Sequence, residues 1–151
     1  MTFNDVMEDI KSTIEDDAAL AAFCTAKWGK TITVKRVFRR RTEVALDQLP
    51  IVLLTRPATK GLRWTIGERE YEQSVMLYFG FHQPDTDKAQ AEQVELEEKI
   101  EDALIVQYKD PNHLPAGAED ITPGESVNDE GANHPTYWTV KGIGVDYKRT
   151  I

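Results

Sequence analysis

The chain has 151 residues, of which 40% are hydrophobic and 29% charged, and its net charge is −8. This length and composition predict one globular domain over residues 1–151 and exclude a disordered chain. An isoelectric point near 4.9 argues against a general nucleic-acid binder, and no apolar run approaches the roughly 20 residues of a membrane span.

The start of the chain and its single cysteine bear on where the protein resides. The first residues, MTFNDVMEDIK, are acidic and lack the basic head and apolar stretch of a signal peptide. We therefore expect a protein that stays in the cytoplasm. Cys24 lies among alanine, leucine and phenylalanine residues, which predicts a buried and inert thiol.

Charge is distributed along the sequence in blocks. Residues 27–63 hold ten Lys and Arg against two acids, a net charge of +8. Residues 1–26 have a net charge of −5, and residues 64–151 have a net charge of −11. A domain with a basic belt between acidic flanks has the polarity to attract its own copies, because the basic face of one copy can meet the acidic face of the next.

Two helices are predicted at the start of the chain. Met7, Ile10 and Ile14 recur at helical spacing, which predicts a helix over residues 4–15. An alanine-rich segment predicts a second helix over residues 17–27.

The next segments favour strands. Residues 31–38 are rich in β-branched side chains, which predicts a strand, and residues 39–48 form a polar, basic connection. The continuous apolar run IVLLT at residues 51–55 is typical of a central strand that is covered on both faces.

Residues 68–82 predict an unusually long strand. Val75, Leu77 and Phe79 alternate onto one face. Because most strands run about 5–6 residues, this strand should project beyond an ordinary sheet. Residues 56–67 would join it to the preceding strand as a long loop or arm.

The C-terminal half begins with the clearest helix, predicted over residues 86–107. Leu96, Ile100 and Leu104 define its apolar stripe, and acids occupy most of the remaining surface, so this helix should present an acidic wall.

A long irregular loop is predicted after this helix, at about residues 109–135, because this segment holds four Pro and three Gly without periodicity. A last strand follows over residues 136–149, with an unpaired edge that another chain could extend. The order of elements predicts an α+β fold. It would have a mainly antiparallel or mixed sheet, helices packed on one face, and one long projecting strand pair or loop.

Residue types that carry chemistry are present but do not converge. His82 lies near Asp85 and Asp87, yet a metal site needs three or four ligands, and a helix start already explains both aspartates. Gly142 and Gly144 lack the third glycine and following helix of a dinucleotide loop. We therefore predict no catalytic residue, no metal and no cofactor, in a protein that is not an enzyme.

The strongest local patch is the basic segment KRVFRRR at residues 35–41. The favoured interpretation is a subunit contact with the acidic helix. The alternatives are that this segment binds a nucleic-acid phosphate backbone, or that it is a solvated loop. Trp64 has two interpretations. It is a residue of the core or of the sheet edge, or it anchors an interface, since Trp is enriched at interfaces.

Four features together resemble a known family. They are a short N-terminal helix, residues 49–54 entering a buried strand, residues 75–81 running into the acidic helix 86–107, and a variable loop followed by a last strand that ends at residues 145–147. This pattern is similar to the tail terminator (tail-completion, minor tail U-like) proteins of long-tailed bacteriophages. Related neck and head-completion proteins share the general plan and stay an alternative.

The resemblance implies a structural role. Proteins of this family are α+β, form hexameric rings that cap the finished tail tube, provide the surface that joins the head, and carry no catalytic site or cofactor. The expected partners are other copies of the chain, tail-tube proteins and head-completion proteins, with no membrane and with DNA less favoured. The expected location is the host bacterial cytoplasm during assembly and then the virion tail.

Charge complementarity adds candidate residues for the contact between neighbouring subunits. We expect one side of that contact to hold Arg36, Arg39, Arg40, Arg41 and Trp64. We expect the opposite side to hold Glu95, Glu98, Glu101 and Asp102.

Overall fold

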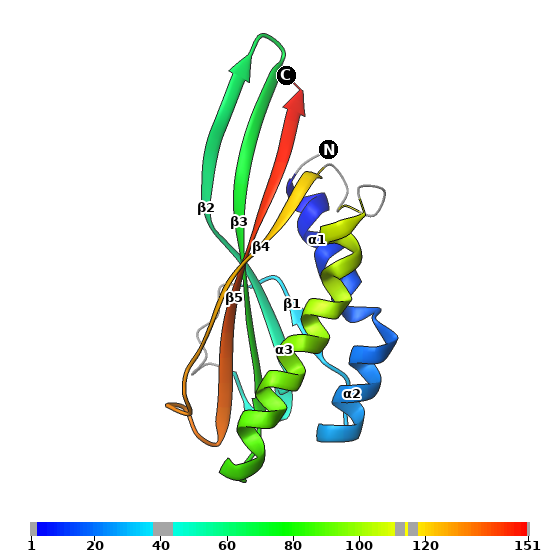
Figure 1. Ribbon diagram of the computed structural model, residues 1–151, viewed down its shortest axis with the longest axis vertical. Helices are drawn as coiled ribbons and strands as arrows, with labels where there is room; N and C mark the ends of the chain where they lie inside the picture. The colour runs from blue at the N-terminus through cyan, green and yellow to red at the C-terminus, as the bar shows by residue number, and fades with distance from the viewer. Residues whose placement is uncertain (1–2, 38–43, 111–113, 115–117, 151) are drawn as a thin grey trace.

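The computed structural model describes residues 3–37, 44–110, 114 and 118–150, and it has an α+β fold (Figure 1). The helices are α1 (Phe3–Glu15), α2 (Ala18–Trp28) and α3 (Thr86–Lys109), with a short 3₁₀ turn at Leu46–Gln48. The strands are β1 (Thr33–Lys35), β2 (Ile51–Thr65), β3 (Glu68–His82), β4 (Ala118–Asn128) and β5 (Thr136–Thr150). They form one sheet in the order β1-β2-β3-β5-β4, in which only the β1–β2 pair is parallel.

The helix boundaries follow from local capping chemistry. The Asp17 carboxylate accepts a hydrogen bond of 2.8 Å from the backbone N–H of Leu20 and caps the start of α2. Gly29 ends the same helix with φ of 79°, a conformation that glycine adopts without strain. At the start of α3, the Asp85 carboxylate accepts a hydrogen bond of 3.0 Å from the N–H of Asp87.

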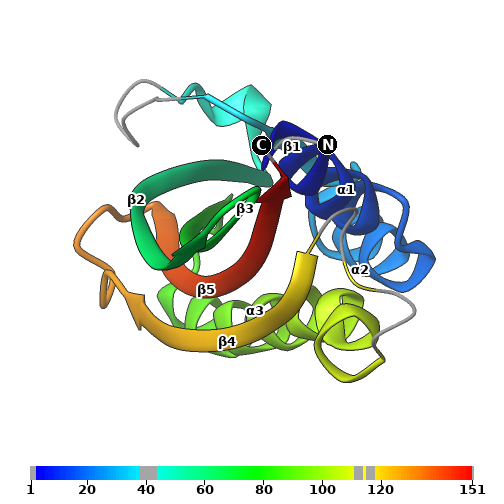
Figure 2. The ribbon, with the colours of Figure 1, turned by 90° about the horizontal axis from the view of Figure 1, so that it is seen from above.

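The helices cover one face of the sheet and bury the main core against it (Figure 2). The alternation predicted for β3 is confirmed, because Val75, Leu77 and Phe79 are at most 1% exposed. A smaller apolar cluster on the opposite face includes Ile51 and Trp138. The start of β2 is thus buried on both sides, as its continuous apolar run predicts.

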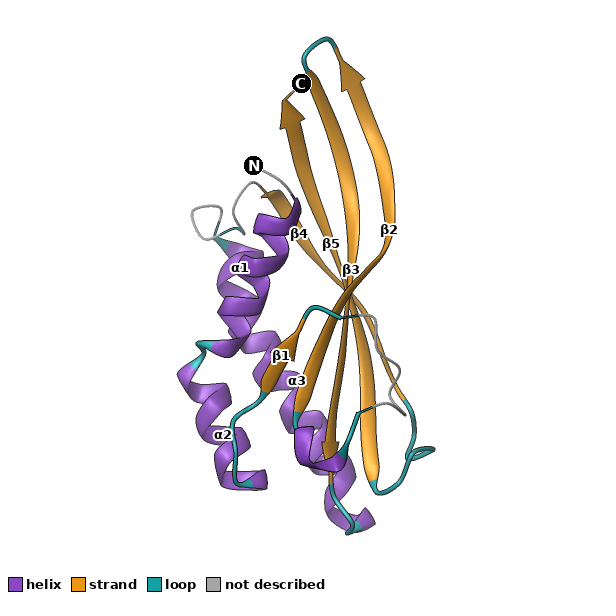
Figure 3. Cartoon of the chain, turned by 180° about the vertical axis from the view of Figure 1, so that it is seen from behind, coloured by secondary structure: helices purple, strands orange, loops and turns teal. Residues whose placement is uncertain are grey.

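Strands β2, β3 and β5 extend beyond the helices (Figures 1 and 3). β2 and β3 continue as a hairpin to a two-residue turn at Ile66 and Gly67, where Gly67 has φ of 86°. We call residues 56–72 together with residues 146–150 the arm. Its strands confirm the predicted projection, and the register of β2 shifts near Pro57 and Gly61, which lets β2 include both residues.

The prediction of an irregular loop at residues 109–135 is wrong for the middle of that segment. Residues 118–128 form strand β4, which pairs with β5. This strand carries no clear alternation, since only Ile121 is buried and the register shifts on both sides of Pro123. As a consequence β5 lies between β3 and β4, so the prediction that the last strand offers an unpaired edge is also wrong.

The first strand is shorter than predicted. Instead of residues 31–38, β1 covers only Thr33–Lys35 and pairs in parallel with the start of β2. Among the helices that the structure describes, none is long and apolar enough to cross a membrane.

The close contact between β3 and β5 makes one glycine critical. A β-carbon at Gly80 would lie 2.6 Å from the ring of Trp138, which is 2% exposed and has no room to move. We expect Gly80→Ala to lower the free energy of unfolding by about 1–3 kcal/mol, measured by urea denaturation. Gly144→Ala is the matched control, because a β-carbon there meets nothing within 4 Å. Equal effects of the two changes would contradict this packing argument.

Candidate interaction surfaces

The arm has an outer face that points away from the helices and carries a row of charged side chains, three of them acidic. The strand register places Lys60 opposite Glu72, Glu72 opposite Asp146, and Asp146 opposite Asp120. Three carboxylates therefore stand side by side on β3, β5 and β4. Like charges directly across neighbouring strands destabilise a sheet, so this row weakens the fold that carries it.

The environment of Asp146 shows the cost of this row. Burial and then the neighbouring charges of Glu72 and Asp120 raise the pKa of the Asp146 carboxyl above its ordinary value. Folded proteins violate local rules of this kind mostly at functional sites. The outer face of the arm is therefore a candidate interaction surface.

Lys148 balances part of this charge one row closer to the tip. Its ammonium lies 3.0 Å from the carboxylate of Glu119, 3.4 Å from that of Glu68 and 3.6 Å from that of Glu70. Its hydrogen bond to Glu119 is the main reason that its pKa is raised. One lysine faces three acids here, so the outer face stays acidic.

The far half of β2 and its turn are basic and apolar instead. Residues 56–67 contain two Arg and one Lys and no acid. At the tip, Leu62 is 44% exposed and Ile66 is 105% exposed. Trp64, predicted as an interface anchor, lies in β2 opposite Arg69, but its side chain lies outside the described part of the structure.

The predicted basic cluster is only partly described. The Arg36 guanidinium donates hydrogen bonds of 2.9 Å to the Glu8 carboxylate and 2.7 Å to the side-chain oxygen of Asn4. This contact ties the chain after β1 to α1, so Arg36 has an acidic partner within its own subunit. Arg39, Arg40 and Arg41 lie outside the described residues.

The predicted acidic wall on α3 divides into two kinds of residue. The Glu95 carboxylate lies 3.8 Å from the ammonium of Lys27, and that of Glu101 lies 3.7 Å from the ammonium of Lys141. Glu98 and Asp102 are exposed, and no cation in the described part of the chain pairs with them. The predicted basic set thus stays untested, because only Arg36 of its members has a described side chain, and the predicted acidic set divides between residues with and without a described cation.

Lys141 is a buried charge between β5 and α3 that the sequence interpretation did not single out. Its side chain is only 5% exposed, and Glu101 supplies an anionic partner. The signal was present in the sequence, because strict alternation puts Lys141 on the same face as Ile143 and Val145.

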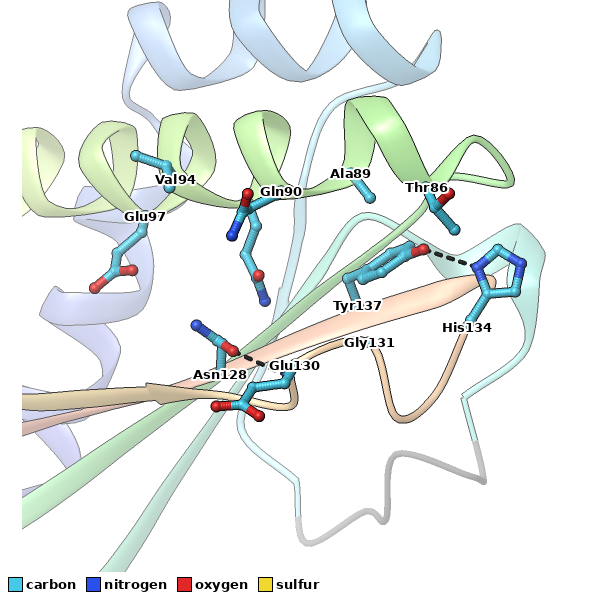
Figure 4. Close-up of a pocket in the computed structure, with 11 residues that line it drawn as sticks. Thr86, Ala89, Gln90, Val94, Glu97, Asn128, Glu130, Gly131, His134 and Tyr137 are labelled. Carbon is cyan, nitrogen blue, oxygen red and sulfur yellow. Dashed lines mark hydrogen bonds between the residues drawn. The ribbon is translucent and has the colours of Figure 1, made fainter.

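A cleft of about 700 Å³ opens between α3 and the segment that links β4 to β5 (Figure 4). We call it the α3 cleft. Gln90, Val94 and Glu97 contribute from α3, and Asn128 and Glu130 lie across from them. At one end of the α3 cleft, the Nδ1 atom of His134 lies 2.7 Å from the Tyr137 hydroxyl, with which it shares a hydrogen bond.

Neither metal ligands nor a reactive thiol stand out in the described residues. No group of three or more His, Cys, Asp or Glu side chains is placed there to hold a metal ion. Cys24 is fully buried, as predicted, and burial raises its pKa to about 12.

No protein-family model matches the chain, and no curated protein matches it. Its function is therefore argued from the surfaces described above.

The Glu101–Lys141 pair gives a first test of this geometry. We expect Glu101→Ala to lower the free energy of unfolding by about 1–3 kcal/mol, because it leaves a buried ammonium without its partner. Lys141→Met removes the charge but keeps much of the volume, so we expect a change within about 1 kcal/mol. Glu98→Ala, on the exposed side of the same helix, is the control. If Lys141→Met lowered the free energy of unfolding more than Glu101→Ala does, the buried ammonium would not depend on Glu101 as we expect.

The carboxylate row gives a second test. We expect Asp146→Asn to raise the free energy of unfolding by about 0.5 kcal/mol at pH 7, because it relieves repulsion between neighbouring strands. The raised pKa of Asp146 means that the folded chain holds this proton more tightly than the unfolded chain. The gain should therefore disappear as the pH falls through the raised pKa to below the ordinary value of 3.8.

Glu70→Gln serves as the comparison, since Glu70 lies 3.6 Å from Lys148, so its loss removes this attraction together with the weakest of the repulsions that act on Asp146. Thermal unfolding of both variants from pH 3 to pH 8 provides the measurement. The interpretation fails if Asp146→Asn is neutral or destabilising at pH 7.

Proposed function

We propose that this chain is a structural assembly protein, a tail terminator of a long-tailed bacteriophage or prophage. Several copies form a ring that caps the tail tube and offers the surface to which the head attaches. Its action is contact between surfaces and not catalysis. The projecting arm is the observation that carries this proposal.

The arm supports the proposal because it exceeds what a compact core needs. Its strands continue past the helices, and its turn exposes Ile66 completely. A segment built this way gives little to the stability of its own subunit and has the reach to contact another. Large exposed apolar side chains at such a point are typical of contact sites.

The separation of charge on the arm supports a contact between unlike faces. The far half of β2 is basic, whereas the outer face around Glu72 and Asp146 is acidic. A ring requires a heterologous interface, in which two different patches of one subunit complement each other. The arm and α3 together carry patches of both signs.

The described contacts change which residues we assign to the basic side. Arg36 is held by Glu8 within its own subunit, so it contributes less to a contact between subunits. We therefore rest the basic side on Arg39, Arg40 and Arg41 together with residues 56–67. On the acidic side, Glu98 and Asp102 are better placed than Glu95 and Glu101, which have partners of their own.

Two alternative functions give different experimental outcomes. A neck or head-completion protein would leave tail length unchanged and block only the joining of heads. A nucleic-acid-binding module would use residues 35–41, and the pairing of Arg36 with Glu8 removes one cation from that surface. Tight binding of DNA by the isolated protein at moderate salt would favour this last function.

Charge reversal tests the assembly. We expect the wild-type chain to form discrete rings at low salt, visible by electron microscopy and sedimentation. The triple change Arg39→Glu, Arg40→Glu and Arg41→Glu should raise the protein concentration needed for assembly at least tenfold, which corresponds to about 1.4 kcal/mol. Lys30→Glu, at an exposed position after α2, is the control. Unchanged assembly of the triple variant would exclude these arginines from the contact.

A genetic experiment tests the role in the tail. Deletion of the coding sequence from the phage or prophage that carries it should give tubes of uncontrolled length without heads, because nothing caps the tube. Electron microscopy of lysates measures both properties. Tails of normal length that still lack heads would assign the chain to the neck, and normal virions would refute a tail role.

A further inference from the structure

We infer that the tip of the arm of one copy binds in the α3 cleft of a second copy. The inference rests on the self-assembly proposed above and names the two surfaces that meet. The ligand class of the cleft is an apolar β-hairpin turn with basic side chains on the strand that leads to it, and the occupant is residues 60–67 of the same protein.

The cleft offers unpaired negative charge. Glu97 contacts the Ser126 hydroxyl, and no cation in the described part of the chain pairs with Glu97 or Glu130. The turn that holds Glu130 is fixed by hydrogen bonds. The Asn128 side chain accepts from the N–H of Glu130 at 2.9 Å, and the Asp129 side chain accepts from the N–H of Gly131 at 3.1 Å. The carboxylate of Glu130 is therefore presented from an ordered backbone.

The cleft also offers apolar surface beside these carboxylates. Val94 lines it and is 51% exposed, although it lies on the helix that supplies much of the core. The buried amide of Gln93 donates to the Trp138 carbonyl oxygen at 3.2 Å and to the Thr139 hydroxyl at 3.1 Å. These bonds hold α3 to β5, so the wall of the cleft is rigid and preformed.

The arm tip matches the cleft in both respects. Among the described residues only five large hydrophobic side chains are exposed, and two of them, Leu62 and Ile66, lie at the tip. On the strand that leads to the turn, Lys60 and Arg63 follow Arg56 without an acid. Arg56 itself lies at the base of the arm, where it donates to Gln73 at 3.5 Å, and Glu68 follows the turn on β3. Basic side chains beside exposed apolar ones are the chemical complement of an exposed valine next to two carboxylates that pair with no cation among the described residues.

Contact through the tip is favoured over extension of the sheet by strand pairing. Among the described residues, the short β1 forms one edge of the sheet, and the long open edges are the rest of β2 beyond β1 and the whole of β4. Both are interrupted by a proline and by register shifts, at Pro57 and at Pro123. Such interruptions oppose the addition of another strand. The turn at Ile66 and Gly67 has no such protection.

The geometry requires two copies. The arm tip and the link between β4 and β5 lie at opposite ends of the long axis of the molecule (Figure 1). A tip therefore never reaches the cleft of its own subunit. Contact between two different patches is heterologous, so repetition gives a ring if the rotation closes.

Complementation between two defective variants tests this contact. The arm variant carries Leu62→Asp and Ile66→Asp and keeps its cleft, and the cleft variant carries Val94→Lys and Glu130→Lys and keeps its arm. We expect each variant alone to sediment as a monomer. An equimolar mixture should form a 1:1 dimer and nothing larger, because only one intact tip and one intact cleft can meet. All four positions are exposed, so folding should be unaffected.

Matched controls carry the same kinds of change elsewhere on the surface. Leu46→Asp controls for the arm variant, and Glu125→Lys with Val127→Lys, on β4 outside the cleft, controls for the cleft variant. Both controls should assemble like the wild type. A monomeric mixture, or assembly by either interface variant alone, would overturn the inference.

Cross-linking captures the contact even when it is weak. The double variant Ile66→Cys and Val94→Cys, treated with a short bismaleimide, should give covalent dimers and larger species, because the native Cys24 is buried and does not compete. Ile66→Cys paired with Leu46→Cys should stay monomeric. Absence of cross-linked dimers from the first variant would overturn the contact.

These results separate the inference from the proposed function. Wild-type assembly with failed complementation and cross-linking refutes the tip-in-cleft contact but leaves the ring proposal standing on other surfaces. Successful complementation together with normal virions after gene deletion keeps the contact and refutes the tail role.

Discussion

The helices of this protein are shorter than the strands they cover, and most of its architecture follows from that mismatch. A helix of 24 residues such as α3 spans about 36 Å, whereas a strand of 15 residues such as β3 spans about 50 Å. Where the helices cover the sheet, Val75, Leu77 and Phe79 are buried. Beyond that cover the arm carries charged, polar and aromatic side chains on strands held by their own ladder hydrogen bonds, and at its base Tyr147 still packs against the core.

Charged residues have two different roles in the two regions. Under the helices, the buried ammonium of Lys141 has its own carboxylate, and such pairing is what keeps a buried charge tolerable. On the outer face of the arm, Glu72, Asp146 and Asp120 repel one another instead. A stable monomer has no need of that repulsion. A neighbouring copy that brings cations to the row would remove it, which makes association more favourable than the isolated subunit suggests.

The sequence predicted the elements whose signal is local. The period-two pattern of residues 68–82 and the helical stripe of residues 86–107 lead directly to β3 and α3. β4 was missed because an exposed edge strand buries only Ile121, and its proline resembles a loop signal. Pairs such as Arg36 with Glu8 could not be predicted, since they join residues 28 positions apart in the chain. The α3 cleft was missed for the same reason, because a helix and a distant turn form it together.

Several surface features that are unfavourable in an isolated subunit would be stabilised by a contact between subunits. The exposed turn at Ile66 and the exposed Val94 each leave apolar area in water, and the carboxylates of Glu97 and Glu130 have no described cation beside them. The arm tip lies at one end of the elongated molecule, and the link between β4 and β5, which forms one wall of the α3 cleft, lies towards the other (Figure 1). Bringing the ends of neighbouring copies together buries the apolar groups and pairs the charges in a single contact. In the proposed assembly, an arm that projects from one end of the sheet would make that contact directional, which is what a closed assembly of identical subunits requires.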